Sequence, residues 1–397
     1  MRTKIGIPRS LFYYKFIPFW DSFFTGLGAE VVVSGPTNKL ILDNGVKNCV
    51  DEACLPIKLC FGHVLDLKDK ADYILVPRFT SISRKEYICP EFGGLPDVIR
   101  HSLKDLPPLI TTEVNLRRSE RGGINAAIEM AAEIGVDRKK AAAAYRRAVE
   151  VQREKGGSFA MDEYFGEKAT RDTAIRDTAT RDTAIRDTGA GTLSHTTENP
   201  AGIQGKRPET KELSLRFDRH TTENPASIQE KRPGTKEPSL RFDFAGQGRK
   251  LQVAVIGHPY NIYDRFISMD LLGKLKKYGV GIKTIEMVQE DEINKQAANL
   301  KKPMFWYYGR TAYGAAVQLA SQGEIDGMIC VTSFGCGVDS VVNDLIERRI
   351  RKEYQIPIII MTIDEHSGEA GFNTRLEAFV DMLQWRRENE NYISTPG

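Results

Sequence analysis

A repetitive segment at residues 169–248 divides this chain and limits where folded structure can form. The triplet Arg171-Asp172-Thr173 recurs at positions 176, 181 and 186, and His195–Asp218 is nearly copied as His220–Asp243. A period of five residues fits neither a helix nor a strand, and the segment offers almost no aliphatic side chains to bury. Because chain entropy then outweighs burial, we predict a long, disordered, low-complexity insert.

Strand and helix signals alternate on both sides of the insert, and such alternation is typical of βαβ units with a mostly parallel sheet. We therefore predict two α/β domains, residues 1–168 and 249–397. The expected strands are Lys4–Ile7, Glu30–Ser34, Asp72–Pro77, Leu109–Thr112, Leu251–Gly257, Gly281–Glu286, Met328–Val331 and Pro357–Ile363. The expected helices are Pro18–Leu27, Asp137–Gly156, Met269–Tyr278 and Thr374–Glu388.

The composition argues against several classes of protein. Lysine and arginine number 56 against 53 acidic residues, so a net charge of +3 gives no reason to expect a nucleic-acid or membrane partner. The first residues lack the apolar core of a secretory signal, and the apolar run Ile356–Ile363 is too short to span a bilayer. We expect a cytoplasmic protein with reduced thiols, which serve metal binding, catalysis or packing rather than disulfides.

Three of the six cysteines stand in a sequence context that is typical of element ends. Cys54 precedes Leu55-Pro56, Cys89 precedes Pro90, and Cys336 lies between two glycines. Thiols on turns of distant segments can converge on one inorganic centre. We expect different roles for the other three cysteines. Cys330 lies in an expected strand and is predicted to be a core residue, whereas Cys49 and Cys60 are predicted to be chemically inert.

The spacing of the cysteines adds little to this argument. Ferredoxin-type iron–sulfur sites contain C-x₂-C pairs, which the chain lacks, so spacing alone favours buried or idle thiols. A structural zinc site needs four tetrahedral ligands with one close pair, and the six histidines do not form one. The triplet Asp364-Glu365-His366 offers ligands for a hard cation, but adjacent loop residues more often form a solvated turn.

Other motifs favour structural roles. No G-x-G-x-x-G follows the first expected strand and no G-x₄-G-K-[ST] occurs, so we expect no nucleotide site in this chain. We interpret His63 as a hydrogen-bonded structural histidine. The aromatic residues Trp306–Tyr308 beside Arg310 read as core packing at a helix start, although an arginine there could hold an anion.

Segments spread over both parts of the chain form a combination that is specific to one family. They are Gly6–Arg9, Phe19–Gly28, Ser34–Asn38, Glu52–Lys58, Gly62–Val64, Cys89–Asp97, Phe334–Ser340, Asp364–Gly371 and Thr374–Phe379. The chain thereby resembles the activase-associated domain of the 2-hydroxyacyl-CoA dehydratase and benzoyl-CoA reductase superfamily. The resemblance covers nearly everything outside residues 169–248, and relatives do not generally carry that insert.

The resemblance implies two Rossmann-like lobes with mostly parallel sheets that face one another and hold a [4Fe–4S] cluster on Cys54, Cys89 and Cys336. It also implies single-electron transfer at low potential, with ATP hydrolysed by a separate actin-like activase. An acyl-CoA substrate and an oligomeric assembly are compatible with it. Whether the chain is itself an enzyme stays open. The alternatives are a non-catalytic accessory protein that binds an activase or dehydratase subunit, and a zinc-stabilised binding module.

Deletion of residues 169–248 should leave the thermal midpoint of unfolding nearly unchanged, because the segment has too few aliphatic residues to contribute to a core. Differential scanning calorimetry of the full chain and of the deletion variant measures this. A large fall in the midpoint would show that the segment packs against the folded parts.

Overall fold

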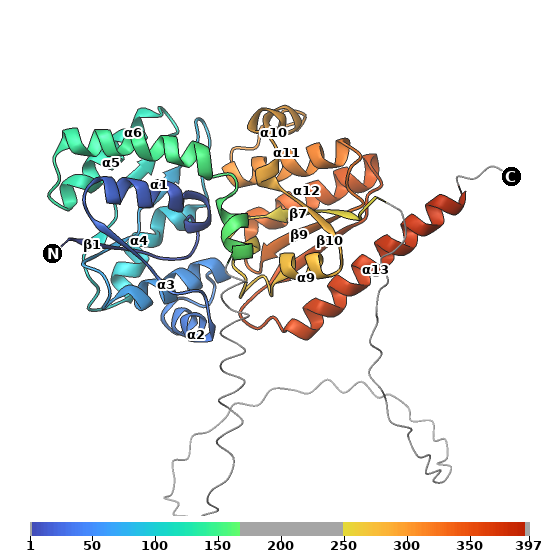
Figure 1. Ribbon diagram of the computed structural model, residues 1–397, viewed down its shortest axis with the longest axis horizontal. Coiled ribbons are helices and arrows are strands. Elements are labelled where there is room, and N and C mark those ends of the chain that lie inside the picture. The colour runs from blue at the N-terminus through green and yellow to red at the C-terminus, as the bar shows by residue number, and fades with distance from the viewer. Residues whose placement is uncertain (1, 167–248, 394–397) are drawn as a thin grey trace, which may run out of the picture. The chain divides into compact units, whose positions relative to one another are not determined.

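Helices and strands alternate through both parts of the computed structural model, which describes residues 2–166 and 249–393, with side chains as far as residue 389 (Figure 1). The predicted insert at 169–248 lies outside the described residues. The strands are β1 (Lys4–Ile7), β2 (Glu30–Val33), β3 (Tyr73–Leu75), β4 (Arg78–Ser81), β5 (Leu109–Ile110), β6 (Glu113–Asn115), β7 (Gln252–Gly257), β8 (Gly281–Thr284), β9 (Gly327–Ser333) and β10 (Ile358–Ile363). The helices are α1 (Tyr13–Gly26), α2 (Lys39–Asn48), α3 (Leu55–Leu67), α4 (Pro90–Ser102), α5 (Arg121–Glu133), α6 (Arg138–Lys155), α8 (Pro259–Ile262), α9 (Leu271–Lys277), α10 (Glu290–Ala297), α11 (Tyr307–Ser321), α12 (Gly337–Glu353) and α13 (Glu369–Ile393), with a 3₁₀ turn at Ile285–Met287.

Each half of the chain builds one four-stranded parallel sheet. The strand order is β2-β1-β3-β5 in the first half and β10-β9-β7-β8 in the second. When only the four strands of each sheet are counted in chain order, both sheets have the order second, first, third, fourth, and every pairing is parallel. The predicted α/β fold with mostly parallel sheets is therefore confirmed, and β4 pairs with β6 in a short parallel extension of the first half.

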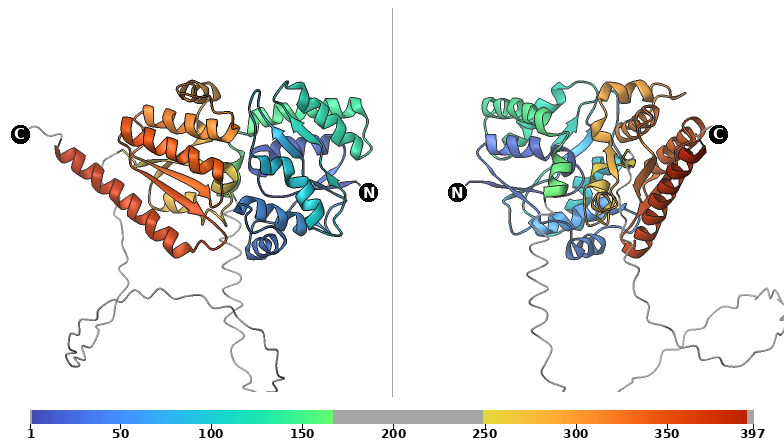
Figure 2. Two further views of the ribbon diagram at one scale, coloured as in Figure 1. Left: turned by 180° about the vertical axis from the view of Figure 1, so that it is seen from behind. Right: turned by 45° about the vertical axis from the view of Figure 1, so that its right-hand side comes forward.

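The alternation of side chains along β7 explains how helices cover both faces of the second sheet (Figure 2). Ala254 and Ile256 pack in one buried cluster with residues of α11 and α12. Val253 and Val255 point to the other face and join the larger cluster that includes α9, α13 and the first half. All four of these side chains are buried, which is the pattern of a strand covered on both faces.

Helix α1 begins five residues earlier than the sequence predicts, at Tyr13 instead of Pro18. Pro18 lies inside the helix, where it lacks the N–H that would continue the backbone hydrogen bonds. Tyr13, Tyr14 and Ile17 are nevertheless buried in the core, and their packing outweighs the lost bond. The predicted N-cap at Asp137 is confirmed, since its carboxylate accepts the backbone N–H groups of Lys139 and Lys140.

A buried ion pair joins the two halves of the described chain, which belong to one compact unit. The Arg310 guanidinium on α11 donates two hydrogen bonds to the Glu86 carboxylate, and the two residues are 9% and 8% exposed. Next to this pair, the backbone N–H of Tyr87 donates to Phe305 and the N–H of Tyr307 donates back to Tyr87, at 2.8 and 2.9 Å. Lys58 on α3 forms a second ion pair across the halves with Glu365.

A buried chain of hydrogen bonds crosses the halves at His63, as the sequence predicts for a structural histidine. His63 Nδ1 lies 2.9 Å from the Ser34 hydroxyl and Nε2 lies 3.0 Å from the Thr37 hydroxyl. Thr37 donates onward to the Asp264 carboxylate at 2.5 Å. Burial lowers the pKa of His63 to about 3, so the imidazole is neutral in the folded protein.

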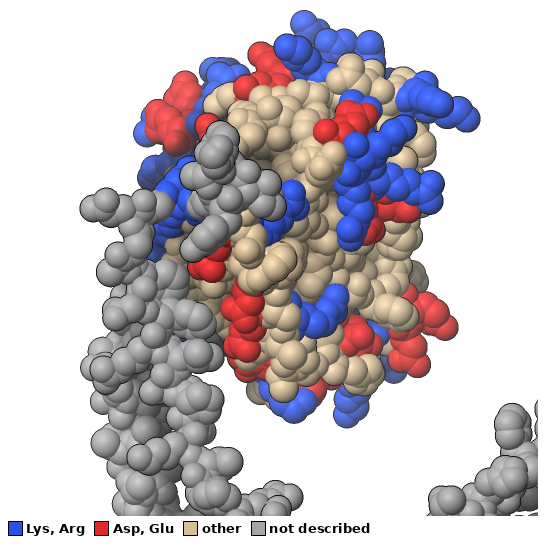
Figure 3. Space-filling view, turned by 90° about the vertical axis from the view of Figure 1, so that its right-hand side faces the viewer, with Lys and Arg blue, Asp and Glu red and all other residues tan. Residues whose placement is uncertain are grey.

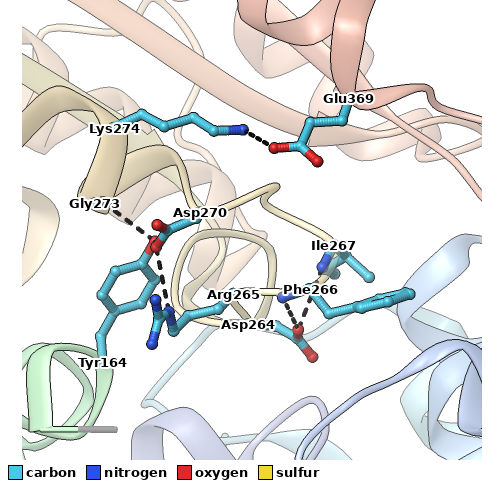
Figure 4. Close-up of polar contacts among 9 residues, drawn as sticks. All are labelled: Tyr164, Asp264, Arg265, Phe266, Ile267, Asp270, Gly273, Lys274 and Glu369. Atoms are coloured by element: carbon cyan, nitrogen blue, oxygen red, sulfur yellow. Dashed lines mark hydrogen bonds and ion pairs between the residues drawn. The ribbon is translucent and has the colours of Figure 1, made fainter. Parts of the chain in front are cut away.

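A turn of the second half is fixed by polar contacts around Asp264 and Asp270 (Figure 4). Asp264 Oδ1 accepts the backbone N–H groups of Phe266 and Ile267. Asp270 adopts a left-handed φ of 55° before α9 and accepts hydrogen bonds from Tyr164 of the first half, at 2.9 Å, and from Arg265. The strained backbone at Asp270 is thus held by two partners.

Arginine side chains cover the outer edge of the second sheet, where β10 is the last strand. Arg375 donates to the carbonyl of Ile360 at 2.6 Å, and Arg351 donates to that of Ile358 at 3.4 Å. Basic and acidic side chains are interspersed with uncharged surface on the face shown in Figure 3. Among the described residues, no helix has the length and apolar character that a membrane crossing requires.

Arg310→Met should lower the free energy of unfolding by about 3–5 kcal/mol, because it leaves the Glu86 carboxylate buried without a cation. The double variant Arg310→Met, Glu86→Gln should recover part of this loss. The control Arg348→Met breaks an exposed pair on α12 and should change stability by about 1 kcal/mol or less. Denaturant titration measures all three, and equal losses in the single and double variants would contradict the role of the pair.

The free energy of unfolding should decrease as the pH falls below 6.5, in part because the folded protein keeps His63 neutral. Its folded pKa of about 3 lies below the ordinary value of 6.5, so below pH 6.5 the unfolded chain takes up a proton that the folded chain excludes. This contribution is complete above pH 6.5 and is lost at about 1.4 kcal/mol per pH unit as the pH falls toward 3. His63→Asn should flatten the slope of the free energy of unfolding against pH between about pH 3 and 6.5, which denaturant titration at several pH values measures.

Candidate functional site

The three cysteines that the sequence places at element ends are the N-cap residues of three helices. Cys54 precedes α3, Cys89 precedes α4, and Cys336 precedes α12. All three line one cavity of about 360 Å³, which takes its walls from both halves of the chain. We call it the cysteine cavity. The structure therefore brings together Cys54, Cys89 and Cys336.

Backbone N–H groups at the helix starts face these sulfur atoms. The N–H of Asp339 donates to Cys336 Sγ at 3.5 Å. Burial raises the pKa of the Cys54 and Cys89 thiols, and the N–H groups of Ile57 and Glu91 oppose that rise. Each sulfur thus lies at the positive end of a helix dipole, which stabilises negative charge.

A carboxylate shares the cavity with the thiols. Glu91, in the first turn of α4, accepts a hydrogen bond from Cys54 Sγ at 3.2 Å. Its negative charge adds to the effect of burial in raising the pKa of Cys54. In the protein without a bound cation, the Cys54 sulfur is therefore a protonated thiol. A metal cation reverses this, because coordination stabilises the thiolate directly.

A histidine–aspartate pair lies beside Cys336. His258, the N-cap residue of α8, is 8% exposed, and its Nε2 lies 2.9 Å from Asp339 Oδ1. Burial lowers the pKa of His258, but the Asp339 carboxylate and Cys336 outweigh it and raise the pKa to about 9. His258 Nδ1 is buried and has no hydrogen-bond partner among the described residues. The ligand atoms of His258, Cys336 and Asp339 lie within 4.8 Å of one another.

Aromatic rings form much of the remaining wall. Tyr260 stacks on the His258 ring at a centroid distance of 4.9 Å, and Tyr308 meets that ring edge-on at 4.4 Å. Trp306 also lines the cavity and is the N-cap residue of α11, so the predicted helix start is confirmed. Arg310 is held by Glu86, Glu290 and Asn294, which leaves its guanidinium engaged within the protein.

The other three cysteines lie outside the cavity wall. Cys330 is fully buried in β9, as predicted for a core residue. Cys60 is buried within α3, where burial raises its pKa to about 12. Cys49 is half-buried at the end of α2. The triplet Asp364-Glu365-His366 forms a turn in which Asp364 accepts the N–H of His366 and Glu365 pairs with Lys58.

Sequence reasoning missed His258, Glu91 and Asp339 as neighbours of the thiols. One signal would have found the first of them. A proline occupies the first or second helical position after Cys54, Cys89 and His258, where its missing N–H carries no penalty. The same local pattern therefore marks three of the helix starts that converge on the cavity.

Comparison with known protein families accounts for most of the chain. Residues 4–288 match the family model described as CoA enzyme activase uncharacterised domain (DUF2229). Residues 290–383 match the model described as 2-hydroxyglutaryl-CoA dehydratase, D-component. No curated protein matches the chain. Both models agree with the superfamily that the sequence motifs resemble, and they indicate a dehydratase-related role.

Proposed function

We propose that this chain, which belongs to the CoA enzyme activase uncharacterised domain family, holds a [4Fe–4S] cluster on Cys54, Cys89 and Cys336. In this role it serves as an electron-transfer or reductase component of a system related to 2-hydroxyacyl-CoA dehydratases. One observation carries the proposal: three thiols at the starts of three helices, drawn from both halves of the chain, line the same cavity.

The donor set fits such a cluster. Iron in iron–sulfur clusters is held by thiolates, and the cavity offers three, with backbone N–H groups directed at the sulfurs. When bound, the cluster supplies single-electron transfer. The chain's own residues hold the thiolates, orient them through the helix starts and exclude water with the rings of Tyr260, Trp306 and Tyr308.

The partner in this proposal is a separate ATP-dependent activase of the actin-like type, which delivers electrons to the cluster. The two matched families, an activase-associated domain and a dehydratase component, support partnership within a dehydratase system. An acyl-CoA thioester is the substrate class that these names suggest. As a non-catalytic accessory protein, the chain would bind the same activase but would not itself convert a substrate.

One observation favours a second candidate, a protein that binds a single zinc ion. His258, Cys336 and Asp339 offer a nitrogen, a sulfur and an oxygen ligand atom within 4.8 Å of one another. This set shares Cys336 with the proposed cluster but does not use Cys54 or Cys89. The two candidates therefore make different predictions for those cysteines.

Protein purified without oxygen should contain about four iron and four sulfide per chain, as a [4Fe–4S] composition requires. Cys54→Ser, Cys89→Ser and Cys336→Ser should each lose at least about half of the iron, because oxygen is a poor ligand for iron in such clusters. Matched substitutions at Cys49, Cys60 and Cys330 should keep the wild-type content. About one zinc per chain without sulfide, dependent on Cys336 alone among the three, would favour the zinc candidate instead.

A further inference from the structure

A second cavity, of about 520 Å³, lies beside the cysteine cavity and takes its walls from both halves of the chain. Tyr307 and Tyr308 at the start of α11 line both cavities. Lys15 on α1 is also part of the wall, and we call the space the Lys15 cavity. Its volume lies within the range of small-molecule binding sites.

The Lys15 cavity lies where an α/β sheet commonly binds ligands. Gly257, the last residue of β7, is part of its wall. From β7 the chain goes to β8 on one side, and β9 then pairs on the other side of β7. The carboxyl end of β7 is therefore the point at which the strand order reverses, and crevices at such points are the usual ligand sites of parallel sheets.

Two cations line this cavity, the half-buried Lys15 and the exposed Arg153. Lys15 has no carboxylate within ion-pair distance among the described residues. Its Nζ lies 5.2 Å from the centre of the Tyr307 ring and 5.8 Å from that of Phe16. Burial lowers the pKa of Lys15, but Tyr307, Glu286 and Glu290 outweigh it and raise the pKa above its ordinary value. The ammonium is therefore charged at neutral pH.

The two nearby acidic residues already have other partners. Glu290 binds the Arg310 guanidinium at 2.7 Å, and Glu286 accepts a hydrogen bond from the Tyr263 hydroxyl at 2.7 Å. In contrast to these two carboxylates, the Tyr308 hydroxyl is buried and has no hydrogen-bond partner among the described residues. The cavity wall thus combines the half-buried Lys15 with a tyrosine hydroxyl that has no hydrogen-bond partner among the described residues.

We propose that the Lys15 cavity binds a small carboxylate, whose charge pairs with Lys15 and whose carbon chain packs against Tyr307 and Tyr308. One ammonium and one hydroxyl suit the two oxygens of a carboxylate. The aromatic wall favours a ligand with an apolar part, which inorganic phosphate lacks. This proposal goes beyond the metal centre and does not depend on it, because it concerns binding in the neighbouring cavity.

The test measures binding by calorimetry or saturation-transfer NMR on the full chain, prepared without oxygen. Butyrate, n-butanol and n-butylamine have the same carbon chain and differ in charge, and inorganic phosphate is an anion without a carbon chain. Butyrate should bind, and the other three should bind at least about tenfold more weakly, because n-butanol and n-butylamine lack the negative charge that pairs with Lys15 and phosphate lacks the carbon chain that packs on the aromatic wall.

The variants separate a ligand role from a structural one. Lys15→Met should weaken butyrate binding by about tenfold or more, and Lys15→Arg should keep most of it. Tyr308→Phe removes only a hydroxyl that has no partner, so it should weaken binding without lowering the thermal midpoint. Lys139→Met, on the exposed side of α6, is the matched control and should bind butyrate as the wild type does.

Absence of butyrate binding, equal binding of butanol, or tighter binding of phosphate would each overturn the proposal. So would wild-type affinity in both Lys15→Met and Tyr308→Phe. If Lys15→Met fails to fold, Tyr308→Phe and the comparison among the four probes still decide. Loss of the iron centre with butyrate binding intact would contradict only the proposed metal function.

Discussion

The buried contact between Arg310 and Glu86 is the interaction on which the geometry of both cavities depends. It fixes the start of α11 against the loop that leads into Cys89, and the backbone bonds between Tyr87 and residues 305–307 set the register of that contact. Cys89 comes two residues after Tyr87, and Tyr308 two residues before Arg310. A shift at this junction would move one thiol and the shared aromatic wall together.

The three thiols illustrate how helix starts can prepare a site for a cation. A buried sulfur with a raised pKa is a poor ligand until a positive charge arrives, and the helix dipoles lower the penalty of making it a thiolate. Because Cys54 and Cys89 come from the first half and Cys336 from the second, coordination would join the halves by bonds stronger than packing. Binding free energy at such a site is partly folding free energy.

The sequence predicted the parts that depend on local pattern. Strand β1 has the predicted bounds, because it contains the β-branched Ile5 and Ile7 and Pro8 follows it directly. The N-cap at Asp137 followed from its side-chain chemistry. Cys54, Cys89 and Cys336 were singled out because proline and glycine mark element ends. The start of α1 was predicted wrongly because tertiary burial of Tyr13 and Tyr14 overrides the local effect of Pro18.

The rest of the site depends on long-range contacts that no local pattern encodes. His258 and Asp339 are separated by 81 positions, and the Lys15 cavity combines α1 with residues near 290 and 307. Neither Lys15 nor Glu91 stands out in composition or spacing. Their position follows from two similar sheets placing their helix starts at a common boundary, which becomes visible only once the strand order is known.

The arginines along β10 have a consequence for assembly. Arg351 and Arg375 occupy backbone carbonyls that an additional strand would need, so joining a second sheet at this edge would first require breaking those bonds. Association by strand addition is thus disfavoured at the β10 edge of the second sheet. Because the arginines occupy carbonyls of β10, this isoleucine-rich edge strand is also less able to pair with other chains and aggregate.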